Sequence, residues 1–337
     1  MNKNGTVWKD TQGNDIQCHA GSIHYFEGRY FWYGESKAGC GDARRGSPKP
    51  RQAGINCYSS NDLKQWTFEG QMLTPSNDSK NDLYFNNVLD RPHVLYHKTT
   101  RKYVMWMKVV HGIFEYQQRS AVAIADSPTG PFEYQGSFLP CGLASGDANL
   151  FVEDRNTQYA IEGQVMPENA DFMQFAPKAY WVFSHPHRSI VVADLTDDYM
   201  SCTGMYSHHL PRKGAPYGRE APLIFYRDWK YYILTSGTSG YESNPLDYAT
   251  AEILHGEWKG HGNPCFGEGS GNTYGLQFAS VLELHDKPNH YLGLADKWDR
   301  ENIEQSAYAL IPFTFTNDKL EIRWCDEWSL DAFTSHE

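Results

Sequence analysis

One glutamate stands at the head of a strongly apolar segment. Glu220 lies in "GREAPLIFYR", directly before a run rich in Leu, Ile, Phe and Tyr that is typical of a buried strand. A charge at the edge of a buried strand is costly unless another group pairs with it or uses it. Glu220 is therefore a candidate functional residue, and the question is which element of the fold positions it.

A recurring pattern predicts that element. A turn with Gly, Lys or Asn precedes a Tyr-led strand five times, and most copies are followed by a strand, a small polar turn and an aromatic residue. The leading residues lie 56 to 73 positions apart and are Tyr30, Tyr103, Tyr159, Tyr231 and Tyr291. Repeats of this size have room for about four strands each, as in propeller blades. We predict an all-β chain that forms a single five-bladed β-propeller over residues 1–337. A β-sandwich is the alternative, which the paired second motif disfavours.

The propeller hypothesis brings distant polar residues together. The innermost strand of each blade lines a central funnel, and we expect it directly before the Tyr-led strand. Four of the five inner segments carry a polar residue just ahead of an apolar run, and these residues are Asp90, Asp147, Glu220 and Gln277. Any one of them could be a turn residue or a strand-end cap. Four at the same level of successive blades indicate a site.

The order of segments resembles glycoside hydrolase family 43, and within it the exo-β-1,3-galactanase (galactan 1,3-β-galactosidase) branch. The likeness runs from "WKDTQGNDIQCHAGSIHYF" through "REAPLIFYRDWKYYILTSG" to "DEWSLD" and covers nearly the whole chain. The resemblance implies a five-bladed propeller that hydrolyses glycosidic bonds with inversion. It further implies exo-action on terminal β-1,3-linked galactose, with an oligosaccharide or polysaccharide such as galactan or arabinogalactan as substrate.

The resemblance also implies catalytic roles. It carries the general acid onto Glu220 and the carboxylate that raises the pKa of this acid onto Asp147. A like charge nearby is physically suited to keeping an acid protonated. The usual base, an Asp on the first inner strand, has no counterpart in "CHAGSI". Gln277 matches a Gln proposed to serve instead. A neutral amide is a very poor base, so we expect Gln277 at least to position the attacking water, and proton abstraction by it is the lesser alternative.

Further residues are candidates for contact with the sugar. Glu35 in "FWYGES" matches a sugar-contacting Glu of the branch, and Asp90 stands where the branch has a longer Glu. Trp106 and Trp32 offer flat rings that could stack on a pyranose. Residues 163–187 read as an insertion between strands of the third blade. The shorter Asp90 and this insertion put galactose specificity in question more than hydrolysis itself.

Two other functions stay open at this level. An α-L-arabinofuranosidase or β-xylosidase is the commoner family 43 activity, although those enzymes use the first-blade Asp that is missing here. A non-catalytic carbohydrate-binding propeller would also lack a base. Retention of both Glu220 and Asp147 favours an enzyme, because a binding protein has no need of a pKa-tuned acid.

The amino-acid composition excludes some classes of binding partner. The net charge of −11 comes without a basic block, which argues against nucleic acid, and no stretch has the length of a membrane span. The seven cysteines are scattered and predict reduced thiols. The first residues lack the apolar core of a signal peptide, which predicts a cytoplasmic protein, or a secreted or periplasmic one if a leader had been removed. The histidines at 185–187 and 208–209 lack partners at ligand spacing, so we expect no metal and no other cofactor.

Overall fold

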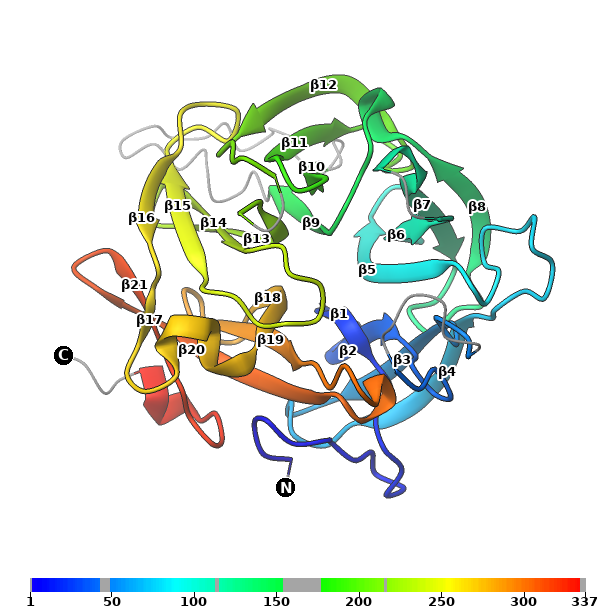
Figure 1. Cartoon of the computed structure of the whole chain (residues 1–337), viewed down its shortest axis with the longest axis horizontal. Helices are drawn as coiled ribbons and strands as arrows, with labels where there is room; N and C mark the ends of the chain where they lie inside the picture. Colours follow the sequence, from blue (N-terminus) through cyan, green and yellow to red (C-terminus); the bar gives the residue numbers. More distant parts are fainter. Residues whose placement is uncertain (1, 43–48, 113–114, 154–176, 215–216, 334–337) are drawn as a thin grey trace, which may run out of the picture.

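Five sheets radiate from a central axis in chain order (Figure 1). The computed structural model describes residues 2–42, 49–112, 115–153, 177–214 and 217–333. Nearly all neighbouring strands within a sheet are antiparallel, as expected for consecutive strands joined by short turns. The predicted five-bladed β-propeller is confirmed, and the β-sandwich is excluded.

Each blade begins with its innermost strand. Blade one contains β1 (His19–Phe26), β2 (Arg29–Glu35), β3 (Ile55–Ser60) and β4 (Thr67–Leu73). Blade two contains β5 (Val88–His97), β6 (Lys102–Val110), β7 (Gln118–Ala125) and β8 (Glu133–Phe138). Blade three contains β9 (Ala148–Glu153), β10 (Lys178–His185), β11 (Ser189–Leu195) and β12 (Cys202–His209). Blade four contains β13 (Glu220–Arg227), β14 (Lys230–Ser236), β15 (Asp247–Ala251) and β16 (Lys259–Gly262). Blade five contains β18 (Gln277–Glu283), β19 (Tyr291–Lys297), β20 (Ala307–Thr316), β21 (Lys319–Arg323) and the short outer strand β17 (Cys265–Phe266), which pairs in parallel with β21.

Side-chain alternation explains why these strands are apolar on both faces. Successive residues of a strand point to opposite sides of its sheet. In β10, Trp181 and Phe183 enter the core shared with blade two, whereas Tyr180 and Val182 enter the core shared with blade four. A core of this kind lies between every pair of neighbouring blades. The near-continuous apolar runs in the sequence follow from this two-sided burial.

The ring closes between blades five and one. Each of the five inner strands contacts the next, and β18 contacts β1. The segment before β1 reinforces this junction, because the buried Asn4 side chain donates to the carbonyl of Leu310 and accepts from its N–H at 2.9 and 2.8 Å. Closure fixes the inner strands relative to one another, so that residues at their ends have defined positions around the funnel.

The third blade corrects one expectation. Tyr159 lies outside the described residues, and the second strand of this blade is β10, in which Ala179 has the position of the leading tyrosines and faces the core shared with the preceding blade. Residues 178–185, which the sequence pattern placed in an insertion, are thus a central strand of the sheet. The error arose because residues 154–177 separate β9 from β10 and contain a second Tyr-led segment of similar pattern.

Candidate active site

The starts of the inner strands surround a cavity of about 200 Å³. It is lined by all four polar residues predicted to converge there, which are Asp90, Asp147, Glu220 and Gln277. They come from four blades: Glu220 and Gln277 are the first residues of β13 and β18, Asp90 lies in β5, and Asp147 immediately precedes β9. The structure therefore brings the predicted ring of polar residues together.

Bulges at the strand starts aim these side chains. The pairing register shifts directly after His19, Asp90 and Glu220, and the next residue in each case has a positive φ: Ala20 (47°), Arg91 (56°) and Ala221 (49°). Bulges next to a site re-aim side chains, and non-glycine residues with positive φ persist only where their surroundings enforce them. At Ala20, the buried Asp296 carboxylate of blade five accepts the backbone N–H at 2.9 Å.

Asp147 is a fully ionised carboxylate. Arg91 Nη2 lies 2.9 Å from Asp147 Oδ2, and Lys108 Nζ lies 2.6 Å from Oδ1. Burial alone would raise the pKa of Asp147, but Arg91 and Lys108 outweigh it and hold the pKa well below its usual range. Lys108 also lies 3.4 Å from Asp90, which ties the second carboxylate into the same network. The two cations let two carboxylates share a cavity wall.

The pKa of Glu220 is shifted in the opposite direction, upward. Its side chain is 13% exposed, and burial together with the nearby charge of Asp147 raises its pKa to about 8, against the influence of Lys108 and Arg91. A carboxyl group with this pKa is mostly protonated at neutral pH and can donate a proton. Asp147, which stays ionised, and Glu220, which stays protonated, thus lie in one cavity.

Gln277 contacts the acid directly. Its Nε2 donates to Glu220 Oε1 at 3.0 Å, and its Oε1 accepts from Trp298 Nε1 at 3.0 Å. An inverting pair needs about 6.5–9.5 Å between its two groups to admit a water molecule. A water-positioning role for Gln277 therefore requires that the sugar separates it from Glu220 on binding. Its part in activating water stays a prediction.

Glu35 lines the cavity as an ion pair. Its Oε2 lies 2.7 Å from Lys37 Nζ, and both side chains are almost fully buried. Burial disfavours charge on Lys37, but the Glu35 carboxylate outweighs it and raises the pKa of the amine. Burial raises the pKa of Glu35 to about 8 although Lys37 opposes this. Glu35 therefore presents a carboxyl group to the cavity, with which sugar hydroxyls can hydrogen-bond.

Trp106 was predicted to stack on the sugar, and this prediction is wrong. The side chain is fully buried between blades two and three, where its Nε1 donates to the carbonyl of Tyr199 at 2.7 Å and its ring packs on Trp181. It lies on the same face of β6 as Lys108, but two residues farther from the end of the strand that reaches the cavity. Trp32 is equally buried, in the core between blades five and one.

The cavity walls were missed by sequence reasoning. In every blade the connection between the second and third strands reaches the cavity, through Arg51, Gly112, His187, Tyr241 and Trp298. His187 Nδ1 lies 3.9 Å from Glu220 Oε2. These loops carry no repeated motif. By contrast, Lys108 inside the apolar strand "KYVMWMKVV" and Arg91 beside Asp90 could have been found as charges in otherwise buried strands.

Comparison with known proteins agrees with this geometry. The model of glycosyl hydrolases family 43 matches residues 46–318. The chain belongs to this family. A GH43 β-1,3-galactosidase solved with galactodeoxynojirimycin is 30% identical and has a TM-score of 0.83, over 97% of this chain and 100% of that one. No curated protein sequence matched.

Two galactanases are also similar. A variant of the exo-β-1,3-galactanase from Phanerochaete chrysosporium, solved with β-1,3-galactotriose, is 25% identical with a TM-score of 0.78, over 97% of this chain and 68% of that one. An exo-β-1,3-galactanase from Clostridium thermocellum is 28% identical with a TM-score of 0.74, over 96% of this chain and 65% of that one. This family 43 glycoside hydrolase thus shares its fold with enzymes that differ from it at most positions.

Among the described residues, no three His, Cys, Asp or Glu side chains are grouped so that they could hold a metal ion. Within the same part of the chain, no helix has the length and apolarity needed to cross a membrane. All seven cysteines are free thiols.

Proposed function

We propose that this family 43 enzyme is an inverting exo-glycosidase that releases terminal β-1,3-linked galactose from galactan or arabinogalactan side chains. The observation that carries the proposal is the pairing of Glu220, whose pKa is raised to about 8, with the ionised Asp147 in one cavity. A purely binding site gains nothing from a buried carboxylic acid kept protonated by a neighbouring charge.

Each residue of the cavity has a role in this proposal. Glu220 protonates the glycosidic oxygen as its bond to the anomeric carbon breaks, and Asp147 keeps the acid protonated until then. Gln277 holds the attacking water on the opposite face of the sugar, and the proton that this water loses as its oxygen bonds to the anomeric carbon passes to solvent water, from which Glu220 is later reprotonated. Asp90 and the Glu35–Lys37 pair accept and donate hydrogen bonds to the ring hydroxyls, which orients the sugar.

Galactose is favoured by the similar structures rather than by the cavity alone. Two of them were solved with galactodeoxynojirimycin and β-1,3-galactotriose, respectively. The volume of about 200 Å³ suits a single sugar residue, which favours attack at a chain end over attack within a chain.

Product analysis tests the proposal. The enzyme is incubated with β-1,3-galactobiose, an aryl β-galactoside, an aryl α-L-arabinofuranoside and an aryl β-xyloside, and the products are followed by NMR. We expect galactose release from the galactosides, with the α-anomer appearing first because the reaction inverts. Release of arabinose or xylose without galactose would identify the enzyme as an α-L-arabinofuranosidase or a β-xylosidase instead of a galactosidase. Binding of galactosides without turnover would identify a non-catalytic propeller.

A further inference from the structure

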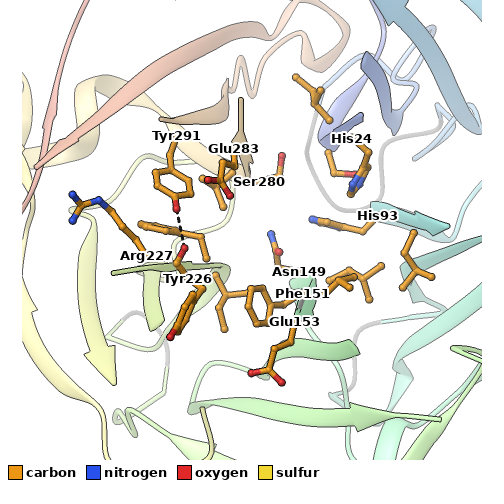
Figure 2. Close-up of a pocket in the computed structure, with 18 of the residues that line it drawn as sticks. His24, His93, Asn149, Phe151, Glu153, Tyr226, Arg227, Ser280, Glu283 and Tyr291 are labelled. Atoms are coloured by element: carbon orange, nitrogen blue, oxygen red, sulfur yellow. Dashed lines mark hydrogen bonds between the residues drawn. The ribbon is translucent and has the colours of Figure 1, made fainter. Parts of the chain in front are cut away.

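A second and larger cavity lies at the other end of the funnel (Figure 2). It has a volume of about 570 Å³ and is lined by the later parts of the inner strands and by the turns that follow them. The strand β13 begins with Glu220 at the candidate active site and ends with Arg227 at this cavity, roughly 20 Å away at the usual rise of a strand. We call it the distal cavity.

Five buried polar atoms of residues that line the distal cavity lack a hydrogen-bond partner among the described residues. Two of them belong to Arg227, whose guanidinium is ion-paired with Asp228 through Nη1 and Oδ2 at 2.7 Å. The other three lie on uncharged side chains and are His93 Nε2, Asn149 Nδ2 and Ser280 Oγ. Each of these side chains is at most 3% exposed, and they come from blades two, three and five. Figure 2 shows them reaching into the same space from different sides. Buried polar groups are normally paired, so their convergence calls for a ligand or ordered water.

The hydrogen-bonding character of these three atoms fits an uncharged ligand. His93 Nδ1 lies 3.1 Å from the carbonyl of Arg91, which can only accept, so Nδ1 carries the proton and Nε2 is an acceptor. Burial lowers the pKa of His93 to about 4, and the ring is therefore uncharged at neutral pH. Asn149 Nδ2 offers donors, and the Ser280 hydroxyl both donates and accepts. Hydroxyl groups of a ligand can satisfy all three.

Other groups at the distal cavity disfavour a charged ligand. Next to the unpaired groups, Ser22 and His24 already pair with each other at 2.8 Å, and His24 accepts from the N–H of Val94. Two carboxylates, Glu153 and Glu283, lie on the lining and would repel an anion. Each oxygen of Glu153 already accepts from the hydroxyl group of a tyrosine, Tyr180 or Tyr231. Arg227 is the one cation among the described residues of the lining, and its ion pair with Asp228 at 2.7 Å compensates its charge. The unmet groups of His93, Asn149 and Ser280 are neutral.

Aromatic walls complete the site. Phe151, Tyr226 and Tyr291 line the distal cavity, and Trp229 stands at its edge with 59% of its surface exposed. Figure 2 shows the first three around the same space as Asn149. A pocket of 300–1,000 Å³ with apolar walls and a few convergent polar groups is typical of small-molecule sites. A sugar residue has both the hydroxyl groups and the apolar ring face that this lining matches.

We propose that the distal cavity is a second saccharide-binding site, which takes one or two neutral sugar residues and performs no catalysis. Hydroxyl groups of the sugar pair with His93, Asn149 and Ser280, and a ring face packs against the aromatic wall. The choice of galactose as the first probe rests on the proposed function, but the site itself does not. Arabinose and xylose are therefore included as probes.

Crystals soaked separately with galactose, arabinose and xylose provide the direct test. We expect sugar in the distal cavity with at least one of them, hydrogen-bonded to Asn149 and Ser280. Calorimetric titration of the same sugar should count this site in solution. Asn149→Leu keeps the side-chain size and removes the donor, so it should weaken binding at the distal cavity about tenfold. Gln135→Leu, an exposed amide of β8, is the matched control and should leave binding unchanged.

A second variant keeps the proposal testable if Asn149→Leu fails to fold. Trp229 is exposed and has a φ of 64°, which Asn tolerates, so Trp229→Asn should fold and still weaken sugar binding several-fold. If only ordered water occupies the distal cavity in crystals soaked with each of the three sugars, the proposal is overturned. Unchanged sugar binding in Trp229→Asn also overturns it. The proposed function fails by a separate result, the absence of galactose release from β-1,3-galactobiose by the unmodified enzyme.

Discussion

The two ends of the funnel are built from the same five strands and hold opposite chemistry. Where the strands begin, charged side chains crowd together, and Asp147 is paired with both Arg91 and Lys108. Where they end, the unpaired groups of His93, Asn149 and Ser280 are neutral. The one cation of the described lining there, Arg227, is ion-paired with Asp228. Burying clustered charges costs stability, which an enzyme tolerates for the sake of its reaction. We infer that one end cleaves bonds and the other only binds.

The same contrast separates two carboxyl groups within the active site. Asp147 and Glu220 are both buried, yet the pKa of the first is held low and that of the second is raised to about 8. The difference comes from their partners, since two cations contact Asp147 and an amide contacts Glu220. Burial therefore does not decide the protonation state of a carboxyl group until its partners are known.

Loss of the acid should have the largest effect. Glu220→Gln keeps the shape of the side chain and removes the proton donor, so turnover of β-1,3-galactobiose should fall about a hundredfold or more. An aryl galactoside with a good leaving group should lose much less, because its leaving group scarcely needs a proton. Steady-state kinetics on both substrates provide the measurement, with Glu133→Gln on the outer strand β8 as control. Equal losses on the two substrates would exclude Glu220 as the acid.

Removal of the amide should have the next largest effect. Gln277→Ala should slow galactobiose and the aryl galactoside alike, by about ten- to a hundredfold, because both reactions need a positioned water. The ratio of the two kcat values measures this directly. If only the galactobiose reaction slowed, Gln277 would belong with the acid step through its hydrogen bond to Glu220.

The pH dependence should respond to the charge beside the acid. The proposed mechanism requires a protonated Glu220, so kcat/KM should fall as the pH rises through about 8. Asp147→Asn removes the like charge and leaves Lys108 and Arg91 in place, which lowers the pKa of Glu220. The alkaline limb should then move to lower pH by about one unit or more. A limb that does not move would contradict the pKa-raising role of Asp147.

The smallest expected effect is on stability. Between pH 4.5 and about 8 the folded protein keeps a proton on Glu220 that the unfolded chain releases, so this group destabilises the fold increasingly as the pH rises through that window. Glu220→Gln should therefore raise Tm by about 2–5 °C at pH 8.5 and change it little at pH 4.5. Thermal unfolding of both proteins at the two pH values tests this. An equal change at both would point to packing rather than charge.

Sequence predicted the parts of the molecule that repeat. The inner strands begin alike in four blades, so the repeat alone was enough to place Asp90, Asp147, Glu220 and Gln277 around one funnel. The ion-pair partners of these residues were harder to predict from sequence, because whether Lys108 reaches Asp147 depends on how blades two and three pack. Trp106 shows the same limit: an aromatic residue in a strand enters a core or a cavity according to its depth in the blade, which sequence periodicity does not encode.

The active-site walls have a consequence for the evolution of the family. The reacting carboxyl groups and the amide stand at the starts of strands fixed by ring closure, whereas Arg51, His187, Tyr241 and Trp298 are presented by loops that carry no such constraint. Insertions and deletions are tolerated in loops far better than in strands. A lengthened or shortened loop can therefore admit a different sugar, or a branch on it, while the proton donor keeps its place. Substrate range and chemistry can diversify independently on this scaffold.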